Sequence, residues 1–183
     1  MKRLDLAYYA GFLSAAEYHG AAHQRPQAFQ VFLAKNRRPI QCGTVRVAFL
    51  ACARITGVPV QRFNTPRGTV RVSSPEATAL DLIGYQRQAG GLDQVVMVLS
   101  ELAERLTPAA LAAAAKTAPV VWAQRLGYLL KHLGFAEKTS ALEAYVRERS
   151  TQSTALLPGA PHERSRYDTG WKLHVNAEVE AEP

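Results

Sequence analysis

The sequence lacks several features that define common protein classes. Its 183 residues include only two cysteines, Cys42 and Cys52, which cannot build a disulfide framework or a C-x-x-C pair. We expect both to be small buried apolar residues. No apolar run approaches the roughly 18 residues of a membrane span, and the start of the chain lacks the apolar core of a secretory signal. The chain is therefore expected in the cytoplasm, without membrane contact.

Motifs for cofactor and metal chemistry are missing as well. The sequence has no G-x-x-x-x-G-K-[ST] or G-x-G-x-x-G phosphate-binding loop and no G-x-S-x-G nucleophile elbow. His19 and His23 are four residues apart, but the Glu that follows the first His in zinc proteases is absent, and Gly20 should end the helix between them. We therefore predict a local structural role for them, and no cofactor, metal or catalytic residue.

Acidic residues are absent between Glu17 and Glu76. That segment carries a charge of +9, whereas the whole chain carries +7, which leaves −2 for the rest. A basic surface of this kind favours nucleic acid as a partner, then an acidic protein, and a solvated basic face without a ligand is the remaining interpretation. The nine bases are Arg25, Lys35, Arg37, Arg38, Arg46, Arg54, Arg62, Arg67 and Arg71.

The first half of the chain is predicted to form one helix and then strands. Apolar residues follow helical spacing over residues 6–19. Alternating apolar residues predict strands over 29–33, 44–50, 58–63 and 69–73, the last two as a hairpin joined by a turn at 64–68. Pro39 should interrupt the basic connection at 35–39.

The second half has a helical period. A helix is expected over 76–84, with one of two N-caps. Either Ser73 is the cap and forms a capping box with Glu76, or Ser74 is the cap and Pro75 occupies the first turn. Further helices are expected over 92–106, from 108, over 119–133 and over 140–148, followed by an irregular excursion at 150–168, a strand at 171–176 and a frayed tail at 177–183. We predict a single α+β domain: a small mixed or antiparallel sheet from the N-terminal half, joined by the C-terminal strand, packed against about five helices.

The predicted elements suggest where DNA or a metal ion could bind. The candidate DNA-binding residues lie in a connection, in a turn or just after that turn, where they can reach phosphates without reading bases. Lys35, Arg37 and Arg38 are in the connection, Arg67 is in the turn and Arg71 follows it. A metal-dependent nuclease remains an alternative function, but its metal-binding carboxylates would have to come from helical residues such as Asp81, because the strand region has none. Because Asp81 lies among apolar residues in the middle of a helix, we expect a buried ion pair with an arginine, of which Arg125 is one candidate.

Seven short motifs, in order, resemble the C-terminal domain of AbiEi-type antitoxins. These proteins are transcriptional regulators of type IV toxin-antitoxin and abortive-infection modules. The resemblance spans about residues 8–180 and rests on the joint order of the motifs, which are Tyr8–Gly20, Pro26–Val31, Arg38–Ile40, Val70–Leu82, Gly90–Leu92, Gln124–Tyr128 and Trp171–Asn176.

The resemblance implies a non-enzymatic antitoxin that counteracts a nucleotidyltransferase-like toxin and assists DNA binding and autoregulation. The family's N-terminal winged helix, which binds the promoter, has no counterpart in the seven residues before Tyr8. The chain is therefore expected to be either a truncated form of a longer regulator or a stand-alone antitoxin domain. A protein-interaction module with no role at DNA is a further alternative. The resemblance supplies no catalytic residues.

Overall fold

A computed structural model describes residues 7–21, 26–66 and 68–179, with Cys42 described in its backbone only. Six strands form one mixed sheet in the order β3-β4-β2-β1-β6-β5. Their bounds are β1 Tyr8–Ala10, β2 Phe29–Leu33, β3 Ile40–Cys42, β4 Val45–Ala51, β5 Val60–Thr65 and β6 Gly68–Ser73. Three short strands form a second sheet in the order β7-β9-β8, with bounds β7 Thr154–Ala155, β8 Arg166–Asp168 and β9 Leu173–Val175.

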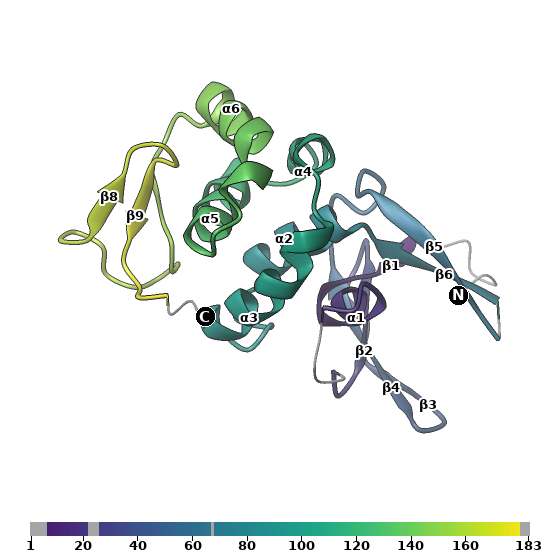
Figure 1. Ribbon diagram of the computed structural model, residues 1–183. Helices are drawn as coiled ribbons and strands as arrows, with labels where there is room; N and C mark the ends of the chain where they lie inside the picture. The colour runs from purple at the N-terminus through teal and green to yellow at the C-terminus, as the bar shows by residue number, and fades with distance from the viewer. Residues whose placement is uncertain (1–6, 22–25, 67, 180–183) are drawn as a thin grey trace.

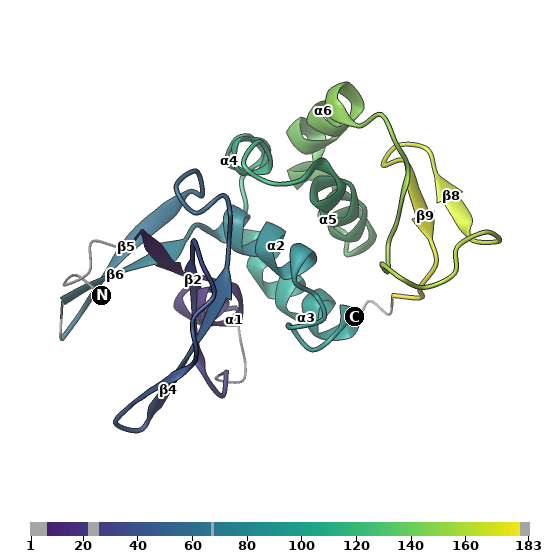
Figure 2. The same cartoon turned by 180° about the vertical axis from the view of Figure 1, so that it is seen from behind.

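The helices lie between the two sheets (Figures 1 and 2). The first helix, α1, packs on the large sheet, and α2 lies against both the sheet and the other helices. The bounds are α1 Phe12–Tyr18, α2 Pro75–Gly84, α3 Leu92–Leu102, α4 Pro108–Ala115, α5 Val120–His132 and α6 Ser140–Arg149, with short 3₁₀ turns at Ala103–Arg105 and Ala136–Lys138. The predicted α+β class is confirmed, and no described helix is both long and apolar enough to cross a membrane.

Local signals placed the helices well. Ser74, not Ser73, is the N-cap of α2: its hydroxyl accepts a hydrogen bond from the Ala77 amide, and Pro75 occupies the first turn. Glu76 does not complete a capping box, because its carboxylate accepts a hydrogen bond from the Thr107 amide instead. Gly20 follows α1 with φ of 71°, a left-handed backbone that glycine adopts without strain.

The start of the expected helix over 6–19 is wrong, because Tyr8–Ala10 form strand β1. β1 pairs with β2 on one side and with β6 on the other, so it is a central strand of the large sheet. Tyr9 stacks on Phe32 of β2 with ring centroids 4.9 Å apart, and both side chains are fully buried. Pairing on both edges decides the conformation of these three residues, which helical spacing alone did not reveal.

The C-terminal strand does not return to the large sheet as expected. β9 pairs instead with β7 and β8, which lie within the 150–168 stretch that was expected to be irregular. Trp171 anchors this second sheet, because its buried ring packs directly over Gly127 of α5. Residues Ala177 and Val179 of the expected frayed tail pack against the core. The single-domain organisation stays a prediction.

Candidate nucleic-acid interface

The first group of basic side chains lies at the β3–β4 edge of the large sheet. Lys35, Arg37 and Arg38 are exposed in the connection from β2 to β3, and Arg46 is exposed on β4. The expected strand at 44–50 is confirmed, with β4 at Val45–Ala51, but strand β3 was not expected. β3 pairs with the first half of β4, so the two strands form a hairpin that projects from the body of the molecule (Figure 1). We call residues 34–46 the basic arm.

A second hairpin lies at the opposite edge. β5 and β6 pair over six residues, which confirms the predicted hairpin, and Arg62 lies directly opposite Arg71. Residues directly opposite in antiparallel strands share a face and have Cβ atoms about 4.5–5.5 Å apart, so two like charges there oppose folding unless an anion lies nearby. Sequence reasoning singled out Arg71 but not Arg62, although the strand register of the hairpin brings them together. We call residues 60–73 the arginine hairpin.

The side chains of six described cations of the acid-free segment take part in no ion pair or hydrogen bond among the described residues: Lys35, Arg37, Arg38, Arg46, Arg62 and Arg71. The candidates Arg67 and also Arg25 lie outside the described residues. The six do not form one continuous patch. Strands β2 and β1 separate β4 from β6, three strand spacings or about 14 Å. The two hairpins diverge from there in both views (Figures 1 and 2).

Arg54 is the exception, because it is the partner of Asp81. Its guanidinium donates a hydrogen bond to the Asp81 carboxylate, which is fully buried, and lies 4.8 Å from the centre of the Trp122 ring. The expected buried ion pair is therefore present, but the suggested partner Arg125 is wrong. Arg125 instead donates to the Ala155 carbonyl and the Thr154 hydroxyl of strand β7.

Burial dominates the electrostatics of this ion pair. It raises the pKa of Asp81 to about 6, since the Arg54 charge and a hydrogen bond from the Tyr9 hydroxyl offset only part of the desolvation. The ion pair fastens the β4–β5 connection to α2. Asp81 therefore has a structural partner and lies inside the core, where it is not available to bind a catalytic metal.

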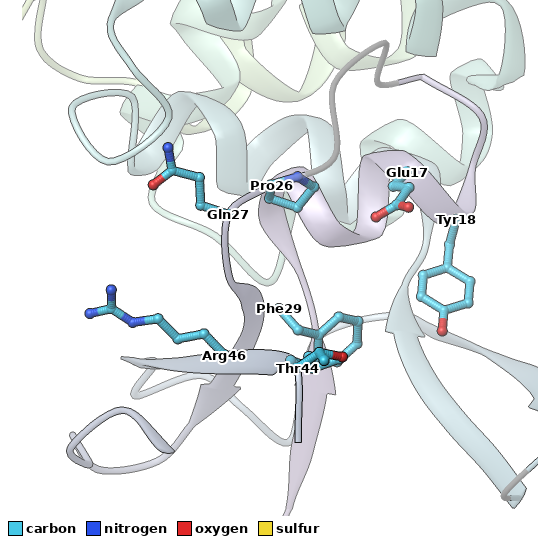
Figure 3. Close-up of a pocket in the computed structure, with 8 residues that line it drawn as sticks. Glu17, Tyr18, Pro26, Gln27, Phe29, Thr44 and Arg46 are labelled. Carbon is cyan, nitrogen blue, oxygen red and sulfur yellow. The ribbon is translucent and has the colours of Figure 1, made fainter. Parts of the chain in front are cut away.

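A pocket of about 570 Å³ opens between α1 and the basic arm. Figure 3 shows Glu17 and Tyr18 of α1 on one side, Phe29 below them, and Arg46 extending outward from β4. The charged lining residues are one carboxylate, from Glu17, and one guanidinium, from Arg46. A pocket of mixed charge matches a polyanion less well than the two hairpins do.

His19 and His23 are expected to have a local structural role and not to bind a metal ion. His19 is buried, and its Nε2 donates a hydrogen bond to the Ser73 carbonyl, 2.7 Å away, which supports the local structural role. Burial lowers the pKa of His19, which favours the neutral ring. His23 lies outside the described residues. Within the described ranges no three His, Cys, Asp or Glu side chains gather as metal ligands would. Cys52 is buried, as expected.

Comparisons with known proteins agree with this architecture. The chain is similar to the RV2827C protein from Mycobacterium tuberculosis, whose crystal structure superposes with a TM-score of 0.60 at 17% identity, a likeness that concerns the fold. The match covers 94% of this chain and 63% of that chain, so this sequence spans less than two thirds of that protein's length. No curated protein matches. The model of the AbiEi antitoxin C-terminal domain matches residues 9–132, and the chain therefore belongs to the AbiEi antitoxin C-terminal domain family.

Proposed function

We propose that this protein is a non-enzymatic antitoxin that counteracts a nucleotidyltransferase-like toxin and contacts promoter DNA through the basic arm and the arginine hairpin. Membership of the antitoxin family supports the antitoxin role. The observation that carries the DNA role is that six cations on two projecting hairpins have no carboxylate partner among the described residues. Phosphates would supply the missing countercharge.

The two hairpins would contact separate stretches of a DNA duplex. The strands that carry them are about 14 Å apart where they leave the sheet. Because the hairpins diverge from there (Figures 1 and 2), their cations are more widely spaced than the two rims of one major groove, about 12 Å, and each hairpin would contact its own stretch of phosphates. Arg62 and Arg71 are held by strand pairing, whereas Lys35, Arg37 and Arg38 lie in a connection. Such contacts position a protein on DNA without selecting a sequence.

The salt dependence of binding tests the DNA role. Two variants remove five of the six cations by group, Lys35→Ala/Arg37→Ala/Arg38→Ala and Arg62→Ala/Arg71→Ala. Fluorescence anisotropy follows their binding to a promoter duplex at increasing salt. Each lost phosphate contact should reduce the slope of log K against log salt by about 0.9, so we expect reductions of about 3 and about 2. The matched control, Lys116→Ala/Lys131→Ala, removes two exposed charges from the helical half and should leave the slope unchanged. Unchanged slopes in both hairpin variants would rule out the DNA role.

Co-expression with a nucleotidyltransferase-like toxin tests the antitoxin role separately. The wild type should restore growth, and persistent growth arrest would rule out the antitoxin role for that toxin. The two hairpin variants belong in the same experiment. If these variants restore growth although the salt dependence of their DNA binding is reduced, the antitoxin role and the DNA role depend on different surfaces.

A further inference from the structure

The tip of the basic arm has a partly exposed apolar face, on which Val45 also borders the pocket beside α1. Ile40 lies opposite Val47, and Val45 is two residues before Val47, so Ile40 and Val45 are on the same face of the hairpin. Their side chains are 47% and 50% exposed. The other face of the tip carries Gln41 and Arg46. The hairpin therefore combines an exposed aliphatic face with a strong positive charge.

A concave surface with the opposite charge lies on the helical half. A groove of about 430 Å³ runs between α3, the end of α5 and the segment after β9. Val96, Met97, Leu133 and Val179 supply its apolar lining, and the Met97 side chain is 48% exposed. The charged lining residues are the carboxylates Asp93 and Glu178. We call this surface the α3 groove.

The segment after β9 is held in place at this groove. The His132 ring nitrogen Nε2 lies 3.0 Å from the Val179 carbonyl oxygen, at hydrogen-bond distance, and Val179 packs against the core. The groove is therefore a formed surface in the free protein. Among the described residues, three of the four exposed large hydrophobic side chains belong to the arm tip or to the groove, the fourth being Tyr167.

We propose that the arm tip of one copy docks in the α3 groove of a second copy. Ile40 and Val45 would contact Met97 and the apolar lining, and the net positive charge of the arm would favour its approach to a groove lined by the carboxylates of Asp93 and Glu178. Since the two surfaces differ, the contact is heterologous and joins copies head to tail. It involves a hairpin tip and one small groove, well below the area of a standard interface, so the association is weak and transient. This inference does not depend on DNA binding.

Sedimentation equilibrium over a range of protein concentrations tests the contact, and low ionic strength keeps the charges effective. The average mass of the wild type should rise with concentration and fall back toward the monomer mass as salt is added. Val45→Glu places a negative charge opposite the acidic groove, and Met97→Lys places a positive charge opposite the basic arm. Each should weaken association at least about tenfold. Because both side chains are about half exposed, both variants should retain the circular dichroism spectrum of the wild type.

Mixing the two variants distinguishes this contact from others. The Met97→Lys protein retains an intact arm and the Val45→Glu protein retains an intact groove, so the mixture should associate although neither variant does so alone. Tyr167→Ser changes an equally exposed side chain outside both surfaces and serves as the control, with association unchanged. If Val45→Glu does not fold, Ile40→Asp replaces it. A wild type that stays monomeric, a variant that associates like the wild type, or a mixture that fails to associate would each overturn the proposal.

Discussion

Replacing Arg54 by methionine should destabilise the protein strongly at pH 8 and only weakly at pH 5. Arg54 is the cation beside Asp81, whose carboxyl group is fully buried and already has its pKa raised to about 6. An adjacent positive charge commonly lowers the pKa of a carboxyl group by 1–3 pH units. Its removal should therefore raise the pKa of Asp81 by about a further two pH units.

The sign and size of the effect follow from proton linkage. At pH 5 Asp81 is mostly protonated in both folded proteins, so the variant loses little beyond the contact of Arg54 with the Trp122 ring. Between pH 6 and pH 8 the folded variant still holds a proton that the folded wild type has released. Each pH unit of that interval costs the variant about 1.4 kcal/mol relative to the wild type, or about 3 kcal/mol in total.

Urea unfolding followed by circular dichroism at pH 5, 6, 7 and 8 measures the difference in unfolding free energy. Asp81→Asn in the Arg54→Met background removes the titrating group, and it should abolish the pH dependence and recover stability at pH 8. Glu143→Gln is the control, since its ion pair with Arg147 is exposed and should contribute less than about 1 kcal/mol at any pH. A cost of Arg54→Met that does not vary with pH, or a second substitution that recovers nothing at pH 8, would refute the reasoning.

Substitutions at three further positions test local features. Gly127→Ala would normally stabilise a helix by about 1 kcal/mol, but here the added Cβ would overlap the buried Trp171 ring. Thermal unfolding should therefore show a net loss of stability of about 1–3 kcal/mol. A rise in melting temperature would contradict this packing. Ser74→Ala removes the N-cap of α2 and should cost about 1 kcal/mol in urea unfolding, whereas Ser74→Asp should cost little. Burial lowers the pKa of His19 below its usual 6.5, so the unfolded chain takes up a proton first and the wild type loses stability as the pH falls through 6.5. His19→Gln keeps an N–H donor without this titration, and unfolding at pH 7 and pH 5 should show less pH dependence than in the wild type.

The helices of the second half could be predicted from sequence because their signals are local. Caps and prolines, such as Ser74 with Pro75 and Thr107 with Pro108, mark the starts, and apolar spacing marks the lengths. The hairpin at 60–73 was equally accessible, since a turn sequence separates two alternating runs. In these segments the residues that decide the conformation are close neighbours in the chain.

The errors concern residues whose partners are distant in sequence. Tyr8–Ala10 follow a helical pattern but form a strand because β2 and β6 pair with both of their edges. Arg54 was not singled out as the partner of Asp81 because the two are 27 residues apart and meet only after the β4–β5 connection folds over α2. The second sheet was missed for the same reason, because β7 pairs with β9, which lies about twenty residues later in the chain.

The sequence by itself determined the class of structure, the absence of acids over residues 18–75 and the likeness to AbiEi antitoxins, all of which can be read from composition and local patterns. Only the tertiary structure decided how the basic residues are arranged. Strand order placed β4 and β6 on either side of β2 and β1, which divided the cations between two hairpins. The fold also pairs Arg54 with Asp81, so that the Arg54 side chain is mostly buried. The net charge of the segment can be counted from the sequence. The positions of the charged side chains in space depend on contacts between residues that are distant in the chain, and local sequence patterns do not predict those contacts.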